Sequence, residues 1–97
     1  DDKMYKRVNS NTYIFEGKTP LSDFVKILDV SDDEFSEIEG EADTLAGLML
    51  DMKGDFPEVH EKFEYDNFCF EIMEVSERRI ASIKVVVREK KGDDKKD

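Results

Sequence analysis

The segment from Asp29 to Asp43 contains eight carboxylates and no basic side chain, so it is the part of the chain best suited to attract cations. Clustered carboxylates supply the oxygen ligands that Mg²⁺ and Ca²⁺ prefer. The candidate metal ligands are Asp32, Asp33, Glu34, Glu37, Glu39 and Glu41. Their spacing does not match the calcium loop D-x-[DN]-x-[DN]-G, and runs of like charge are commonly solvated. A divalent-cation sensor and a solvated acidic loop therefore both remain open.

Two residues that often act as bases or nucleophiles occur once each in the chain. His60 directly follows Pro57-Glu58-Val59, and we expect it in an exposed turn. Cys69 stands between Phe68 and Phe70 without a basic neighbour that would favour the thiolate, so we expect an inert thiol. No Ser/His/Asp set, Cys/His pair or glycine-rich phosphate loop can be assembled from the sequence. We therefore predict that the chain is not an enzyme.

The charge of the chain is strongly acidic but local. There are 25 acidic and 15 basic residues, a net charge of −10, and removing the eight acids of residues 29–43 leaves 17 acids against 15 bases. Nucleic-acid binding needs clustered Lys and Arg, so we expect no nucleic-acid partner. No apolar run approaches the roughly 20 residues that cross a bilayer, so this segment is not expected to insert into a membrane. A single cysteine fits a reducing, cytosolic compartment.

Two segments on either side of the acidic loop have the periodicity of short amphipathic helices. The first begins after Thr19-Pro20, where Thr can cap the helix and Pro suits its first turn, and its apolar residues recur at i, i+3, i+4 and i+7 over residues 21–28. The second is capped by Asp43 or Thr44, repeats that spacing and ends at Lys53-Gly54. We expect the two helices to pack side by side.

Strand patterns occupy both ends of the chain. The predicted strands are Met4–Val8, Thr12–Glu16, Lys62–Tyr65, Phe68–Val75 and Arg79–Arg88. In the last two, the alternation of apolar and polar residues slips between Ile72 and Val75 and between Ile80 and Ile83, which predicts β-bulges. The sequence therefore predicts a small two-layer α+β domain with an antiparallel sheet and two short helices.

The apolar residues are sufficient for one hydrophobic core. Six aromatic residues lie on predicted strands, where core packing is favoured over a stacking platform for a cofactor. They are Tyr13, Phe15, Phe63, Tyr65, Phe68 and Phe70. Phe35 and Ile38 interrupt the acidic run and are expected to pin that loop to the body. We predict one domain over residues 4–89 with disordered ends at 1–3 and 90–97, and a chain that opens on Asp-Asp is expected to be an excised piece.

The order of several short motifs resembles a known family. The motifs are Tyr13-Ile14-Phe15-Glu16-Gly17, Thr19-Pro20-Leu21 with Asp23, Asp43-Thr44-Leu45-Ala46-Gly47-Leu48, Phe56-Pro57, Phe70-Glu71-Ile72 and Arg79-Ile80. As a set they resemble the CorC/HlyC transporter-associated domain, from about Met4 to Arg88. His60 departs from the pattern, because the family usually carries Gly at the position before the acid that here is Glu61. The resemblance carries no catalytic motif.

The resemblance implies a cytosolic C-terminal module of a multi-pass membrane protein at the cytoplasmic face of the bacterial inner membrane. In such proteins it follows transmembrane and CBS domains of the same polypeptide, and the proteins are associated with magnesium and cobalt efflux or named haemolysins. The fold would be similar to a subdomain of FAD-binding (PCMH-like) proteins. Shared architecture does not by itself carry a binding site.

Three functions follow, in this order of preference. The first is an accessory or regulatory domain that docks on its own transporter or on a second copy of itself, through the sheet edge, the face around Phe63 and Tyr65, or the acidic loop. The second is a module that binds FAD or an adenine nucleotide near Thr44 and Gly47. Gly47 costs about 1 kcal/mol relative to Ala inside a helix, so either another backbone approaches it closely or it is simply tolerated. The third is the cation sensor on the acidic loop, with Mg²⁺ as its ligand.

Overall fold

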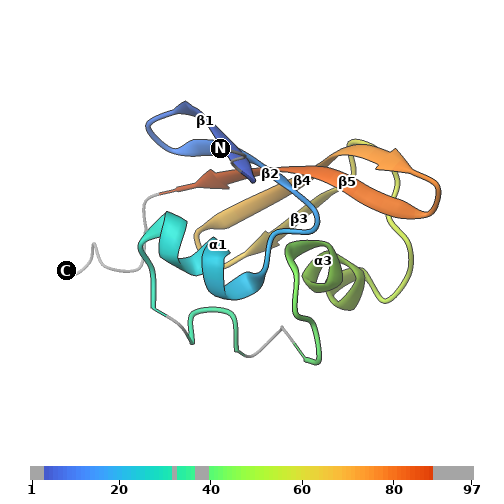
Figure 1. Ribbon diagram of the computed structural model, residues 1–97, viewed down its shortest axis with the longest axis horizontal. Coiled ribbons are helices and arrows are strands. Elements are labelled where there is room, and N and C mark those ends of the chain that lie inside the picture. Colours follow the sequence, from blue (N-terminus) through green and yellow to red (C-terminus); the bar gives the residue numbers. More distant parts are fainter. Residues whose placement is uncertain (1–3, 32, 37–39, 89–97) are drawn as a thin grey trace.

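The computed structural model describes residues 4–31, 33–36 and 40–88. These residues form a five-stranded sheet with two helices beside it (Figure 1). The elements are β1 (Tyr5–Asn9), β2 (Thr12–Glu16), α1 (Leu21–Leu28), α3 (Leu45–Lys53), β3 (Lys62–Tyr65), β4 (Phe68–Ser76) and β5 (Arg79–Val87). The predicted α+β class is confirmed, and the predicted strand ends are off by one residue at most. The predicted disordered ends, 1–3 and 90–97, lie outside the described residues.

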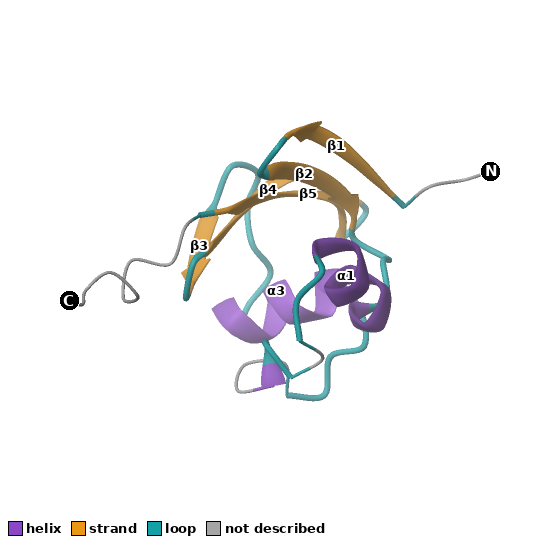
Figure 2. Cartoon of the chain, turned by 90° about the vertical axis from the view of Figure 1, so that its left-hand side faces the viewer, coloured by secondary structure: helices purple, strands orange, loops and turns teal. Residues whose placement is uncertain are grey.

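The sheet is antiparallel throughout, in the order β1-β2-β5-β4-β3. The last strand, β5, lies between β2 and β4, so it joins the opening hairpin to the strands that follow the helices. Both helices lie against the same, concave face of the sheet (Figure 2). Neither described helix covers the opposite face, which we call the open face.

Alternation along the strands sends one set of side chains toward the helices. Phe15, Phe70 and Ile83 are fully buried on this covered face, and they meet Phe24 of α1 and Leu48 of α3 in one core. Phe24 is central, because its ring lies 4.9 Å from Phe15 and 6.3 Å from Phe70 between centroids. A fully buried side chain of this size contributes about 1.5–3 kcal/mol by leaving water. The core positions the helices on the sheet.

The aromatic residues expected in the core pack there. Phe15, Phe68 and Phe70 are buried, whereas the side chains of three others are half-buried and pack against the core. These three are Tyr13, Phe63 and Tyr65. The prediction of core packing is therefore confirmed, and these rings are not exposed as a stacking platform.

The two helices begin differently. Thr44 caps α3 as predicted, but Pro20 itself takes the N-cap position of α1, with extended backbone and no side-chain cap. The prediction that Thr19 caps α1 is wrong, because Thr19 is fully buried and its hydroxyl donates to Glu16 O at 2.6 Å. At the other end, Asp29 closes α1 in the left-handed conformation, with φ 61°.

The predicted β-bulges are confirmed in the long β4–β5 hairpin. The register shifts between Ile72 and Glu74 and again between Glu74 and Val75, opposite the segment from Ile80 to Ile83. Within the described residues, no helix is both long enough and apolar enough to cross a membrane.

Candidate functional site

The acidic loop is only partly described. Asp33, Glu34 and Glu41 lie within the described residues, whereas Asp32, Glu37 and Glu39 lie outside them. Where the loop is described, the Ser31 hydroxyl donates to Asp33 Oδ1 and the Glu34 N–H donates to Ser31 O at 3.0 Å. Over residues 4–31, 33–36 and 40–88, no group of three or more His, Cys, Asp or Glu side chains is placed to hold a metal ion. The six-residue metal site stays a prediction.

Phe35 attaches this acidic loop to the core, as predicted. Its side chain is 1% exposed, and its ring centroid lies 4.9 Å from that of Phe68 and 5.4 Å from that of Phe24. The second expected anchor, Ile38, lies outside the described residues. The loop is therefore held to the core shortly after it leaves α1.

The N–H groups of the first three α3 residues are all used within the protein. Their acceptors are Thr19 O for Leu45 (2.9 Å), Gly17 O for Ala46 (2.9 Å) and Thr44 Oγ1 for Gly47 (3.1 Å). Helix N-termini bind phosphates through N–H groups that point at the ligand. A nucleotide phosphate would have to displace these bonds. Binding of FAD or an adenine nucleotide at Thr44 and Gly47 stays a prediction.

Gly17 is the position where two backbones meet. A Cβ built on Gly17 would lie 2.0 Å from Ile80 O, the carbonyl of a neighbouring strand. A Cβ on Gly47 would lie 3.3 Å from Ala42 Cβ and 3.6 Å from Ala42 Cα. Of the two alternatives for Gly47, close approach or simple tolerance, the structure shows an approach only by the loop directly before α3. The tighter approach at Gly17 was not predicted.

Beside Gly17 the surface has a depression of about 650 Å³ between the start of α3 and the sheet. Of the residues predicted to bind a cofactor, Thr44 lines it and Gly47 does not. Its charged lining is mixed, because Glu16 forms an exposed ion pair with Lys18 at 3.6 Å and Glu74 and Arg79 add one charge of each sign. Such a lining favours neither anions nor cations.

His60 and Cys69 lie where the sequence placed them. His60 occupies an exposed turn, with its side chain 69% exposed and Nδ1 3.1 Å from Glu71 Oε2. Its backbone adopts φ 74°, a conformation that favours glycine. Cys69 is a free, buried cysteine on β4, opposite Glu64 of β3. No Cys–His pair forms within the described part.

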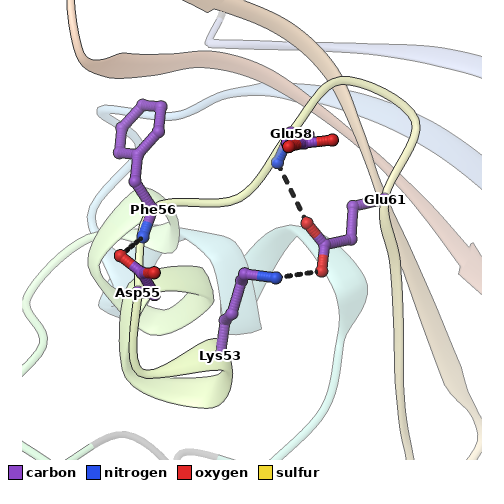
Figure 3. A network of polar contacts seen from close by, with 5 residues as sticks. All are labelled: Lys53, Asp55, Phe56, Glu58 and Glu61. Carbon is purple, nitrogen blue, oxygen red and sulfur yellow. Dashed lines mark hydrogen bonds and ion pairs between the residues drawn. The ribbon is translucent and has the colours of Figure 1, made fainter.

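A polar network connects the end of α3 to the start of β3 (Figure 3). The ammonium of Lys53 contacts Glu61 Oε2, and the Glu58 N–H donates to Glu61 Oε1 at 3.0 Å. The hydrogen bond from Lys53, followed by the one from Glu58, lowers the pKa of Glu61. The hydrogen bond to Glu61 raises the pKa of Lys53. This network fixes the connection between the helix and the sheet.

The sequence analysis missed a row of side chains that crosses the open face. Residues at paired positions point to the same face of a sheet, and the pairs Lys6–Ile14, Ile14–Lys84, Lys84–Glu71 and Glu71–Lys62 run across all five strands. We call these five residues the cross-strand row. The signal was present in the alternation, since each lysine lies one position from a residue of the covered face.

The chain was compared with protein families and solved structures. Residues 6–89 match the model of the transporter associated domain, CorC_HlyC. The transporter associated domain of a CBS domain protein from Porphyromonas gingivalis is 38% identical, with a TM-score of 0.83 over 90% of this chain and 100% of that one. A CorC_HlyC domain of a Xylella fastidiosa Temecula1 hemolysin, in complex with Mg²⁺ and Mn²⁺, is 18% identical, with a TM-score of 0.73 over 90% of this chain and all of that chain. The second likeness shows the fold alone.

Curated relatives are much longer than this chain. The polyamine export proteins of Salmonella typhimurium and of Escherichia coli strain K12 are each 27% identical over 77 residues. These residues make up 79% of this chain and 17% of each relative. The chain thus spans less than a fifth of the length of the curated relatives it matches.

Proposed function

Because the chain belongs to the CorC/HlyC family of transporter-associated domains, we propose that it is a non-catalytic accessory domain of a longer membrane transport protein. It acts by docking on the rest of its polypeptide, or on a second copy of itself. A domain that contacts two conformations of a transporter with different strength shifts the balance between them. The free energy for this shift comes from the difference between the two contacts.

The observation that carries the proposal is the extent of the match. Residues 6–89 include nearly all of the described sheet and both described helices. A 77-residue stretch of the chain corresponds to 17% of each of two export proteins. The relative from Porphyromonas gingivalis comes from a CBS domain protein, which supports CBS domains as partners within the same polypeptide. The cytoplasmic face of the membrane is part of the proposal and follows from the family resemblance.

We further propose that the transported substrate is a cation. The family resemblance suggests magnesium or cobalt, and the curated relatives are named for polyamine export. These substrates differ in size and hydration but share positive charge, so a transport assay should include both classes.

A second candidate function is a divalent-cation sensor on the acidic loop. It is favoured by the eight carboxylates of residues 29–43 and by the Mg²⁺ and Mn²⁺ bound to the Xylella relative. Converting the six candidate acids to amides in the intact protein should then abolish the Mg²⁺ dependence of transport. An unchanged Mg²⁺ dependence would reject the sensor and leave the accessory role untouched.

The accessory role is tested by removing residues 4–88 from the intact protein. Efflux of Mg²⁺, Co²⁺ and a labelled polyamine is measured in membrane vesicles that contain equal amounts of intact and truncated protein. The proposal expects the rate, or its dependence on cation concentration, to change for at least one substrate. Equal rates at all concentrations for all three would reject it.

A further inference from the structure

The open face has a central strip of apolar side chains although no described helix covers it. Ile14 and Val86 are half-buried there, and Cys69 and Thr12, both paired with Val86 across the strands, are only 8% and 7% exposed. Five strands at about 4.8 Å spacing and three side-chain rows at about 7 Å spacing give this face an area of about 400 Å². This is about half of what one partner buries in a standard stable interface.

Some charged side chains of the open face have an ion-pair partner, and others have none. Glu16 and Glu64 form ion pairs with Lys18 and Arg88, and Glu71 Oε2 lies 3.1 Å from His60 Nδ1. The three lysines of the cross-strand row, Lys6, Lys62 and Lys84, have no ion-pair partner among the described residues, and neither does Glu74 at the bulge. In a chain with a net charge of −10, this face retains an excess of unpaired positive charge.

The three lysines are also evenly placed. In the cross-strand row, Lys6 and Lys84 are separated by Ile14, and Lys84 and Lys62 are separated by Glu71. Two strand spacings put successive lysines about 10 Å apart at their backbones, with apolar side chains next to the row. Such a pattern fits a surface that presents spaced carboxylates around apolar side chains.

We propose that the open face is the docking surface of this domain, and that its partner is an acidic protein surface with an apolar centre on the same polypeptide. This inference rests on the proposed accessory function. A contact of this size suits reversible docking, because a tether raises the effective concentration of the partner to about the millimolar range. A domain that must bind one transporter conformation and release another needs such a contact.

The surfaces considered from the sequence fit this role less well. Phe63 and Tyr65 pair with Phe70 and Phe68, so all four lie on the covered face and pack against the core. The face around Phe63 and Tyr65 is therefore already occupied by the protein's own helices and loop. The open face is left as the broad surface with unpaired charge.

Zero-length cross-linking of the intact membrane protein tests the proposal. A carbodiimide joins a lysine ammonium to a carboxylate in contact with it, and peptide mass spectrometry identifies both residues. We expect Lys6, Lys62 or Lys84 to link to Asp or Glu outside residues 4–88. Lys26, on α1, is the control and should not form these links. An isotopically labelled second copy distinguishes links between two copies from links within one polypeptide. The proposal would be overturned if the three lysines linked only to residues 29–43 of the second copy. It would also be overturned if they formed no links.

A variant supplies the second measurement. Lys6→Gln, Lys62→Gln and Lys84→Gln together remove three charges that would pair with carboxylates of the partner. The triple variant should lower the docked fraction, read from the protection of sheet amides against hydrogen exchange in the intact protein, about tenfold. Lys26→Gln should leave it unchanged, and thermal unfolding checks that both variants fold. If deletion of the domain alters transport but the triple variant docks normally, the docking face is wrong and the accessory function stands. If deletion has no effect, the accessory function itself fails.

A membrane surface is the competing partner, and vesicles distinguish it. The 97-residue chain is sedimented with vesicles of phosphatidylglycerol and with neutral vesicles of phosphatidylcholine. Our proposal expects no sedimentation with either at physiological salt. Sedimentation with the anionic vesicles that the triple variant abolishes would overturn an acidic protein partner in favour of lipid headgroups.

Discussion

Replacing Gly17 by Ala should be among the most destabilising single-methyl changes in this chain. The new Cβ would lie 2.0 Å from Ile80 O and 3.2 Å from Ala46 Cβ, and the first of these neighbours is a backbone atom that no rotamer change can move. The loop that contains Gly17 must therefore separate from β5. Two hydrogen bonds hold it there, from Gly17 N to Ala81 O and from Ala46 N to Gly17 O, each at 2.9 Å.

The magnitude follows from these contacts. Overpacking a filled interior costs about 1–3 kcal/mol, and each weakened hydrogen bond adds about 0.5–1.5 kcal/mol. We expect Gly17→Ala to lower the free energy of unfolding by about 2–6 kcal/mol. For a domain of this size, that lowers Tm by roughly 10 °C or more, because each kcal/mol corresponds to about 4–8 °C.

Urea unfolding followed by circular dichroism measures this change, and Gly47→Ala is the matched control. At Gly47 the added methyl meets Ala42 Cβ at 3.3 Å, while the helix gains about 1 kcal/mol in propensity, so the control should stay within about 1 kcal/mol of the wild type. A loss below about 0.5 kcal/mol for Gly17→Ala would refute the reasoning, since such a loss is typical of an unconstrained surface site.

Three further predictions concern turns and charge. The lowered pKa of Glu61 stabilises the wild type above the unfolded pKa of about 4.5, and this stability is lost as the pH falls through the folded pKa. Glu61→Gln should remove this contribution. The unfolding curves of the two proteins should therefore differ at pH 7 and converge in acid. His60→Gly relieves a backbone φ of 74° and should raise the free energy of unfolding by up to about 1 kcal/mol; a loss would mean that the His60 side chain outweighs the strain. Glu77→Asn with Arg78→Gly, at φ 52° and 63° in the β4–β5 turn, should raise Tm by a few degrees, and a lower Tm would contradict the turn geometry.

The fold was predictable because its signals are local. Leu21, Phe24, Val25 and Leu28 have helical spacing, and the alternation in β4 and β5 located even the bulges. Sequence order could not give the strand order, because the position of β5 between β2 and β4 depends on packing between distant segments. The cap of α1 was missed for a similar reason, since Thr19 is a normal capping residue that here lies buried and bonds to Glu16 O.

The candidate site was less predictable than the fold. A glycine reveals close packing only when its neighbours are known, so Gly47 attracted attention and Gly17, which meets Ile80 of a strand more than 60 residues later, did not. The cross-strand row also depends on register, since Lys6, Lys84 and Lys62 are far apart in the sequence. Their shared lack of an ion-pair partner within the described chain is visible only in three dimensions.

The claim that this domain works by docking is tested most directly by amide hydrogen exchange of residues 4–88. Exchange is measured by mass spectrometry in the 97-residue chain and in the intact transport protein, with and without the transported cation. Docking predicts slower exchange on the sheet in the intact protein, and a change in that protection when the cation is added. Identical exchange in the isolated and intact proteins under both conditions would contradict the account.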